Sequence, residues 1–260
     1  MDVEGVVAVV TGGAGGIGRA LAHRLARAGA AAVVVADLDG STADAIAAGL
    51  SGPGGHRGVG LDVTDEAALV ATVARIEAEV GPIGLWCSNA GIAAGRDLGT
   101  NEDWARAWDV HVLAHVYAVR AVLPRMLERG RGHFLVTASA AGLLTEMDLA
   151  PYAVTKHGSV ALAEWLAIRY GGSGVGFSCL CPQAVNTSMI ANAPPESATL
   201  AGGIIEPDQV ADAVLDALAA DRFLILPHPE VAEFARRRVT DPDRWIAGMR
   251  RLRAKLQAGA

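Results

Sequence analysis

Short apolar runs alternate with amphipathic segments along most of the chain. Residues 6–10 form an apolar run that predicts a buried strand. An apolar stripe at helical spacing follows it, made of Ile17, Leu21, Leu25 and Ala28. The same alternation predicts further strands at residues 32–36, 59–63, 85–88, 134–138, 175–180 and 223–226. It predicts helices at residues 17–28, 41–50, 66–80, 102–129, 152–170 and 207–218.

Strands that are apolar on both sides and separated by helices are typical of a parallel sheet with helices on both faces. Repeated strand–helix units with right-handed crossovers build a doubly wound sheet. The sequence therefore predicts an α/β fold of this kind. We find no internal repeat and no low-complexity linker, so we expect a single domain over residues 1–260.

The composition excludes several classes of protein. An apolar fraction of 52% is too high for a disordered chain, and a net charge of -6 argues against a nucleic-acid-binding protein. The longest apolar stretch, residues 30–36, is far shorter than the roughly 20 residues of a membrane span, and the acidic N-terminus is unlike a signal peptide.

The three cysteines lack the spacing of a disulfide framework or a zinc site, which favours reduced thiols in the cytoplasm and no bound metal.

A glycine-rich turn follows the first predicted strand, with the sequence Thr-Gly-Gly-Ala-Gly-Gly-Ile-Gly at residues 11–18. Glycines let the backbone approach a pyrophosphate, and the N-terminus of the next helix offers free N–H groups. The turn fits two patterns of dinucleotide-binding sites, one through Gly13, Gly15 and Gly18 and the other through Gly12, Gly16 and Gly18. Its place between a strand and a helix favours a phosphate cradle over a merely flexible turn.

Asp37 follows the second predicted strand, where a carboxylate can bind the adenine-ribose hydroxyls and repel a 2′-phosphate. No Arg or Lys occurs between this residue and Arg57, which favours NAD over NADP as the cofactor. The alternative is that Asp37 only caps a turn. Asp62, near the end of the third predicted strand, is expected either beside the adenine or as a cap of the next helix.

Tyr152 and Lys156 lie four residues apart in a predicted helix and therefore share one of its faces. A neighbouring ammonium favours the phenolate, so we expect the pKa of the tyrosine to be lowered towards the range useful for proton transfer. Ser139 ends the preceding strand, where ligands bind in open α/β sheets. Its hydroxyl either donates to a substrate oxygen or only forms a turn.

Two other enzyme classes fit parts of this pattern. Methyltransferases also place a glycine turn after the first strand and an acidic residue after the second, but they do not require the pair of Tyr152 and Lys156. A hydrolase would use Ser139 as a nucleophile, but no G-x-S-x-G sequence surrounds it.

Taken together, several motifs resemble the short-chain dehydrogenase/reductase family in order and spacing, from about residue 6 to residue 227. They are residues 11–18, Asp62, Ser88-Asn89-Ala90-Gly91, Ser139, Tyr152-x-x-x-Lys156 and residues 182–187. The resemblance implies a Rossmann fold with seven parallel strands, a nicotinamide cofactor and often a homotetramer. It also implies that Ser139 orients the substrate, that Tyr152 is the acid/base, and that Lys156 binds the nicotinamide ribose and lowers the pKa of the tyrosine.

The same resemblance implies a set of cofactor-binding residues, in which Asn89 supports the pocket and Thr187 contacts the nicotinamide carboxamide. The full set is Gly12, Gly16, Ile17, Gly18, Asp37, Asp62, Val63, Asn89, Ala90, Gly91, Tyr152, Lys156, Pro182, Val185 and Thr187.

The chain departs from the family pattern at two positions. His111 stands where the family usually has an asparagine that holds a water in a proton relay to the lysine. Three roles are open for it: replacing the asparagine through its backbone carbonyl and a helix distortion, joining the relay through its imidazole, or simple packing. Gln183 follows Pro182 where glycine is usual, so we expect its side chain to face the nicotinamide or the substrate.

The segments that the family places over the substrate are rich in apolar residues, namely Leu143, Leu144, Met147, Leu149, Met189, Ile190, Leu200, Ile204 and Ile205. With Ser139 and Gln183, they predict an apolar secondary alcohol or ketone of some bulk, such as a steroid, a terpenoid or a lipid-derived compound. Glu146 and Asp148 argue against an anionic substrate. The irregular residues 187–206 are expected to form a lid.

The C-terminal stretch of residues 231–256 is rich in arginine and carries Trp245, Met249, Leu252 and Leu256 on one helix face. Such a helix can lie on an anionic membrane. We instead expect a helical tail, at about residues 230–257, that docks on its own or a neighbouring subunit with its arginines in solvent.

These features predict an NAD-dependent oxidoreductase that interconverts a secondary alcohol and a ketone by hydride transfer, with Tyr152 as acid/base. The alternative is a non-catalytic NAD-binding sensor or scaffold, which only the unusual His111 favours. We expect a cytoplasmic homo-oligomer, either a dimer or a tetramer, that binds a small-molecule alcohol or ketone and has no nucleic-acid partner and no membrane span.

Overall fold

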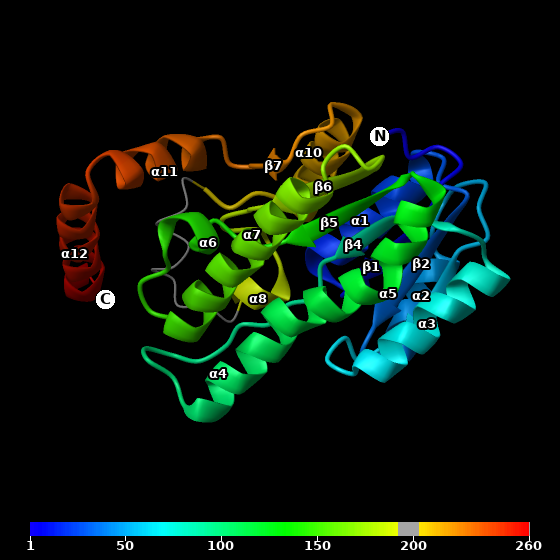
Figure 1. The fold of residues 1–260 in the computed structure, drawn as a ribbon. Helices are drawn as coiled ribbons and strands as arrows, with labels where there is room; N and C mark the ends of the chain where they lie inside the picture. Colours follow the sequence, from blue (N-terminus) through cyan, green and yellow to red (C-terminus); the bar gives the residue numbers. More distant parts are fainter. Residues whose placement is uncertain (192–202, 260) are drawn as a thin grey trace.

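The computed structural model describes residues 1–191 and 203–259 (Figure 1). Its seven strands form one parallel sheet in the order β3-β2-β1-β4-β5-β6-β7. The strands are β1 (Val7–Thr11), β2 (Ala32–Asp37), β3 (Arg57–Gly60), β4 (Ile83–Ser88), β5 (Gly132–Thr137), β6 (Val175–Leu180) and β7 (Leu224–Ile225). The predicted doubly wound α/β fold is confirmed, and the order reverses between β1 and β4, where such sheets open a crevice for ligands.

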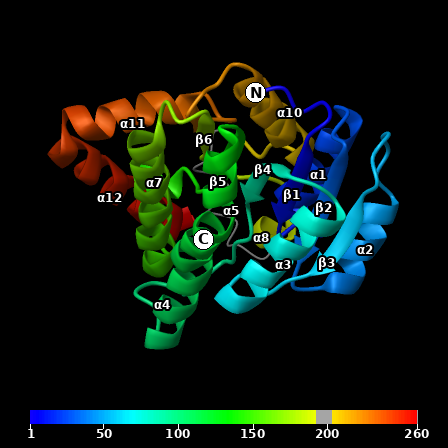
Figure 2. The ribbon, with the colours of Figure 1, turned by 45° about the vertical axis from the view of Figure 1, so that its right-hand side comes forward.

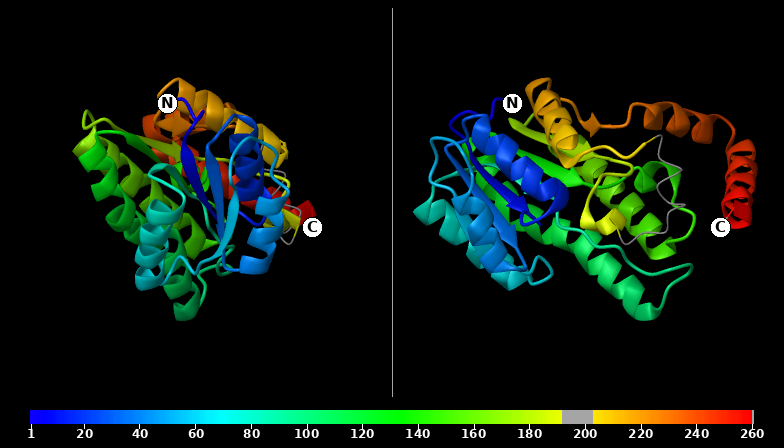
Figure 3. Two further views of the ribbon diagram at one scale, coloured as in Figure 1. Left: turned by 90° about the vertical axis from the view of Figure 1, so that its right-hand side faces the viewer. Right: turned by 180° about the vertical axis from the view of Figure 1, so that it is seen from behind.

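Helices cover both faces of the sheet, as the left view in Figure 3 shows. One layer contains α3 (Glu66–Glu79), α5 (Ala114–Arg129) and α7 (Ala150–Tyr170), and the other contains α1 (Gly16–Arg27), α2 (Gly40–Ala48) and α10 (Pro207–Ala219). Side chains alternate along each strand, so Val9 packs in the first layer and Val10 in the second, both without solvent exposure. Burial on both faces explains why the strands are almost uniformly apolar.

The third strand differs from its prediction. It spans Arg57–Gly60 rather than residues 59–63, because only these four residues pair with β2 at this edge of the sheet. The apolar residues that produced the prediction still pack into the core, with Leu61 buried and Val63 partly buried beyond the end of the strand.

Two predicted helices are interrupted. The helix expected at residues 102–129 consists of α4 (Asn101–Trp108), a π-helical turn η1 (Asp109–Leu113) and α5. The C-terminal tail consists of α11 (Glu230–Thr240) and α12 (Pro242–Gly259), because a proline cannot donate the backbone hydrogen bond that would continue α11. Two short helices, α6 (Ala141–Leu144) and α8 (Ser188–Ala191), were not predicted.

The C-terminal helices extend away from the sheet beyond α6 (Figures 1 and 2). They are held by a small apolar cluster in which Phe234 and Trp245 pack against Leu144 and Val231. None of the helices in the described residues is long and apolar enough to cross a membrane. The cluster places α11 and α12 beside the carboxyl edge of the sheet, where Ser139 follows β5.

The glycine turn after β1 is packed so closely that side chains are excluded from it. A Cβ atom on Gly18 would lie 2.1 Å from the Gly12 carbonyl oxygen, and one on Gly12 would lie 2.9 Å from Ala90 Cα. Gly12 and Gly16 also adopt positive φ angles of 64° and 50°. A Cβ on Gly13 would lie 2.8 Å from a Val35 methyl group, whereas one on Gly15 would meet nothing within 4 Å, so Gly15 is the open position of the turn.

This difference predicts opposite effects of one substitution at two glycines. Gly18→Ser should lower the free energy of unfolding by about 1–3 kcal/mol, because its Cβ meets backbone atoms that cannot move aside. Gly15→Ser should change it little, because the position is open and serine is a favourable first residue for α1. Urea unfolding of both variants measures the difference, and equal losses would contradict it.

Candidate active site

Thr11 ties the glycine turn to the segment after β4. Its hydroxyl accepts hydrogen bonds from the backbone N–H groups of Asn89 at 2.9 Å and Ala90 at 3.1 Å. The Asn89 side chain donates to the Thr11 carbonyl at 3.0 Å. The predicted cofactor residues Asn89 and Ala90 thus lie directly beside the turn. Sequence analysis did not assign Thr11 a role in the site, although it is the first residue of the turn motif.

Asp37 lies at the end of β2, on the other side of the glycine turn. Its carboxylate accepts hydrogen bonds from the backbone N–H groups of Ala14 at 3.0 Å and Asp39 at 3.2 Å. The structure therefore places one negative charge against the turn predicted to hold the pyrophosphate. Asp37 therefore caps a turn, as one interpretation held. This role is compatible with the other interpretation, in which the same carboxylate binds the cofactor.

The other predicted cofactor residues lie in three places. Asp62 accepts hydrogen bonds from Thr64, whereas the cap of α3 is Asp65, so Asp62 does not cap that helix. Ile17, Val63 and Val185 pack mainly against the core. Thr187 approaches the turn, since a Cβ on Gly16 would lie 3.0 Å from its methyl group.

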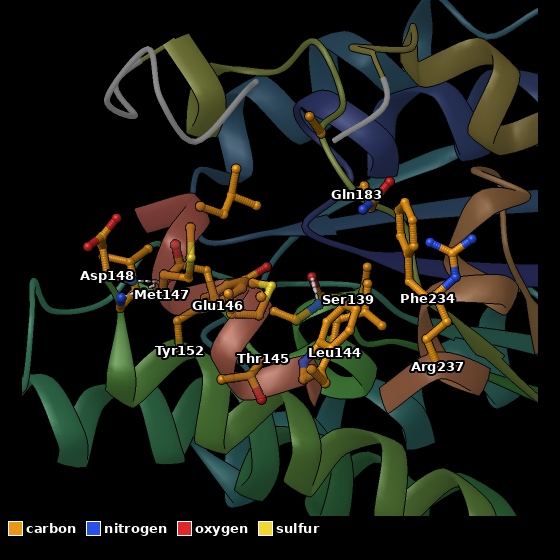
Figure 4. Close-up of a pocket in the computed structure, with 18 of the residues that line it drawn as sticks. Ser139, Leu144, Thr145, Glu146, Met147, Asp148, Tyr152, Gln183, Phe234 and Arg237 are labelled. Carbon is orange, nitrogen blue, oxygen red and sulfur yellow. Dashed lines mark hydrogen bonds between the residues drawn. The ribbon is translucent and has the colours of Figure 1, made fainter. Parts of the chain in front are cut away.

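Ser139 and Tyr152 meet at the carboxyl end of β5. The Ser139 hydroxyl accepts a hydrogen bond from Ala141 N at 3.1 Å and donates to the Pro182 carbonyl at 3.4 Å. Burial raises the pKa of Tyr152, and a hydrogen bond with Ser139 partly offsets this effect. The two hydroxyls that sequence analysis paired are therefore brought together (Figure 4).

Lys156 lies beneath this pair and is almost completely buried. Its ammonium donates to the Thr137 carbonyl at 3.0 Å and lies 5.7 Å from the centroid of the Tyr152 ring. Burial lowers the pKa of Lys156 to about 8. The expected lowering of the tyrosine pKa is not seen, because burial of Tyr152 is the larger effect and its pKa is raised.

His111 lies in the π-helical turn and is fully buried. Its Nδ1 pairs with the Thr155 hydroxyl at 2.8 Å, and its Nε2 lies 3.2 Å from Ile92 N and 3.0 Å from Ile92 O. The ring packs edge-on against Tyr152 with centroids 5.4 Å apart. Burial, assisted by the charge of Lys156, lowers the pKa of His111 to about 2. The imidazole is therefore neutral and joins the segment after β4 to α7.

A cavity of about 1560 Å³ opens beside Ser139 and Tyr152. Its apolar lining includes Leu144, Met147, Leu149, Met189, Ile190, Phe234, Trp245, Met249 and Leu252. Figure 4 shows Ser139, Leu144, Gln183 and Phe234 around this space. The cavity therefore joins the two hydroxyls to the C-terminal helices.

Most residues predicted to contact the substrate line this cavity, including Ser139, Gln183 and Met189. Leu143 does not line it: this side chain packs against the core and the cluster around Val231. The neighbouring Leu144 takes the expected place, because the one-turn helix α6 directs consecutive side chains to different sides. Leu200 and the middle of the predicted lid lie outside the described residues.

The C-terminal tail docks on its own subunit, as predicted, through Phe234 and Trp245. Its arginines other than Arg238 are exposed, as predicted, although several of them also contact the subunit or line the cavity. Arg238 donates to the Leu143 carbonyl, and Arg253 pairs with Asp148 at 3.3 Å. Four others line the cavity, namely Arg236, Arg237, Arg244 and Arg251. The sequence did not predict arginines on the cavity wall. Helical spacing shows which residues share a face, but it does not show which part of the protein that face contacts.

The doubly wound sheet, the tight glycine turn and the grouping of Ser139, Tyr152 and Lys156 define a nucleotide-binding oxidoreductase. The family model of short chain dehydrogenases matches residues 6–198. The chain belongs to the short-chain dehydrogenase/reductase family, as its motifs indicated.

The chain is also similar to individual dehydrogenases of this family. The chain is 36% identical to 1-deoxy-11-beta-hydroxypentalenate dehydrogenase of Streptomyces exfoliatus, over 88% of this chain and 86% of that protein. It is 28% identical to estradiol 17-beta-dehydrogenase 11 of Homo sapiens, over 96% of this chain and 84% of that protein. A short chain dehydrogenase/reductase of Burkholderia phymatum in complex with NAD matches with a TM-score of 0.81 and 32% identity, over 94% of this chain and 96% of that one. The chain is thus a dehydrogenase acting on CH–OH groups, and the non-catalytic alternative is not supported.

The neutral state of His111 predicts how stability depends on pH. Burial lowers the pKa of His111 to about 2, whereas an unfolded histidine has a pKa of about 6.5. Below about pH 6.5 the unfolded chain therefore binds the proton that the folded chain excludes, and this contribution to stability is lost as the pH falls. His111→Asn should reduce the slope of unfolding free energy against pH, near pH 5, by about 1.4 kcal/mol per pH unit. Urea titrations at several pH values measure the slope, and an unchanged slope would contradict a neutral His111.

Proposed function

We propose that the chain is an NAD-dependent oxidoreductase that interconverts a bulky apolar secondary alcohol and its ketone. The observation that carries the proposal is the meeting of the Ser139 and Tyr152 hydroxyls at the wall of a large apolar cavity. The buried ammonium of Lys156 lies behind them. This arrangement provides a hydrogen-bond donor, a proton-transfer group and a positive charge within one site.

The residues of the sheet edge fit a dinucleotide. The turn at Gly12 and Gly18 has no room for side chains, which leaves its backbone accessible at the N-terminus of α1. Asn89 and Ala90 are fixed beside it through Thr11, and Gly91 lies next to Lys156, since a Cβ there would be 3.7 Å from Nζ. NAD, when bound, supplies the hydride acceptor or donor of the reaction.

Tyr152 is proposed to move the proton and Ser139 to hold the substrate oxygen. In ketone reduction the phenol donates its proton to the carbonyl oxygen, and in alcohol oxidation the phenolate accepts the hydroxyl proton. Because burial raises the pKa of Tyr152, the protonated form predominates near neutral pH. Lys156, with a pKa of about 8, is the neighbouring group that can carry a proton onward.

We assign NAD rather than NADP on the basis of Asp37. Its carboxylate borders the glycine turn, and no Arg or Lys lies between it and Arg57. A 2′-phosphate at this place would face a negative charge without a cationic partner from this segment. A relative from Burkholderia phymatum in complex with NAD supports the assignment.

The substrate is proposed to be a bulky alicyclic alcohol or ketone. The cavity is lined by leucine, methionine and aromatic side chains, which favour an apolar skeleton. Relatives are named as dehydrogenases of hydroxypentalenate and of estradiol, which supports a substrate of this size.

We assign His111 a positioning role rather than a direct part in proton transfer. Its ring nitrogens bind Thr155 and the backbone of Ile92, so it holds the first turns of α7 against the segment after β4. Its carbonyl accepts a hydrogen bond from the Ser159 hydroxyl at 2.7 Å. The imidazole thus fixes the helix that carries Tyr152 and Lys156.

We also propose a cytoplasmic homo-oligomer. The three cysteines are free and buried, which fits a reducing compartment. The outer face of α7 exposes Trp165 and Ile168, which are 55% and 85% accessible. Two large apolar side chains on one helix face favour a contact with another subunit.

The central test is Tyr152→Phe, which removes only the phenolic oxygen. This variant should lose more than about 99% of turnover while it still binds NAD, because the proton-transfer group is lost and the ring remains. Formation of reduced nicotinamide with a panel of polycyclic alcohols measures turnover, and calorimetry measures NAD binding. Tyr170→Phe, at the far end of the same helix, is the matched control. Full activity of Tyr152→Phe would disprove the mechanism.

The cofactor assignment predicts that Asp37→Asn improves the use of NADP. The amide still accepts a hydrogen bond from Ala14 but no longer repels a 2′-phosphate. The ratio of kcat/KM for NADP to that for NAD should rise about tenfold or more. Asp44→Asn, on the exposed surface of the neighbouring helix, is a control that should leave the ratio unchanged. A wild-type preference for NADP would overturn the assignment.

A further inference from the structure

The C-terminal helices α11 and α12 contribute arginine side chains to the cavity lining. Five arginines line the cavity, together with four acidic residues. The arginines are Arg96 from the segment after β4, Arg236 and Arg237 from α11, and Arg244 and Arg251 from α12. The cavity lining therefore carries charged as well as apolar side chains.

The acidic residues of the cavity are already engaged. Glu233 binds Arg236 and Arg237, both at 2.8 Å. The Glu146 carboxylate accepts hydrogen bonds from the backbone N–H groups of Asp148 and Leu149. Asp148 forms an ion pair with Arg253, which does not line the cavity. The reason for expecting a neutral substrate from Glu146 and Asp148 is thereby removed.

Asp241 is engaged in a similar way. Its carboxylate accepts a hydrogen bond from the backbone N–H of Arg244 at 3.0 Å, at the start of α12. By contrast, Arg96, Arg244 and Arg251 form no ion pair with any other described residue. These three guanidinium groups are the cations of the cavity that an anionic ligand can bind.

The cavity lining combines apolar side chains with these guanidinium groups. Arg244 and Arg251 are seven residues apart and therefore lie on one side of α12, next to the cavity-lining Trp245 and Leu252. One helix thus presents apolar side chains and guanidinium groups to the same space. A ligand that matches this lining has an apolar body and an anionic end.

We propose that the substrate is a bulky apolar secondary alcohol or ketone that also carries a carboxylate, which binds Arg96, Arg244 and Arg251. The inference rests on the proposed oxidoreductase function for the alcohol end of the ligand. The carboxylate end depends only on the charges of the cavity wall.

The test compares lithocholate, a steroid with a secondary alcohol at one end and a carboxylate at the other, with its neutral primary amide. Calorimetry with the NAD-loaded protein should show that the acid binds about tenfold more tightly than the amide. Arg244→Gln combined with Arg251→Gln should remove this preference and leave the affinity for the amide unchanged. Arg250→Gln is the matched control, because Arg250 is on the same helix but does not line the cavity.

The outcomes separate the two proposals. Equal binding of acid and amide by the wild-type protein, binding of neither, or an equal loss in the Arg250→Gln control would each overturn the carboxylate site. Turnover is read separately: tight, arginine-dependent binding of the acid without oxidation of any alcohol would count against the oxidoreductase function alone. Oxidation of both compounds with the same KM would support the oxidoreductase function but contradict the carboxylate-binding site. Thermal unfolding of each variant confirms that the arginine changes leave the fold intact.

Discussion

The contact between the glycine turn after β1 and the segment after β4 is the constraint on which the site depends. Gly18 and Gly12 approach so closely that no Cβ atom fits between them, and Thr11 bonds the turn to Asn89 and Ala90. Because β1 and β4 are neighbours where the strand order reverses, this contact defines the floor of the crevice. It leaves the backbone of the turn, rather than side chains, to face a pyrophosphate.

Burial then sets the protonation of three titratable groups beside the cavity. Tyr152, Lys156 and His111 share one low-dielectric region, and in each the neutral form is favoured by loss of water. The phenol therefore keeps its proton, the ammonium loses its proton more readily, and the imidazole is neutral. A neutral imidazole can hold Thr155 and Ile92 without placing a second cation beside Lys156. This accounts physically for a histidine where the family usually has an asparagine.

The C-terminal helices form one side of the open cavity at the carboxyl end of the sheet. Trp245 and Phe234 anchor them near Leu144, and Arg253 reaches Asp148 on the opposite rim. The apolar and the cationic side chains of α12 thereby face the same space as Ser139 and Tyr152. The sheet edge supplies Ser139 and Tyr152, and the C-terminal helices supply part of the cavity wall.

The sequence by itself determined the sheet, the helical layers, the glycine turn and the grouping of Ser139, Tyr152 and Lys156. These features depend on short-range periodicity and on the rule that parallel strands end at one edge, both of which are visible in the chain. The tertiary structure alone decided that Leu144 rather than Leu143 lines the cavity, that His111 bonds Thr155 and Ile92, and that exposed arginines of the tail border the cavity. It also showed that the pKa of Tyr152 is raised rather than lowered. Each of these outcomes depends on burial and on contacts between residues far apart in sequence, which spacing along the chain does not encode.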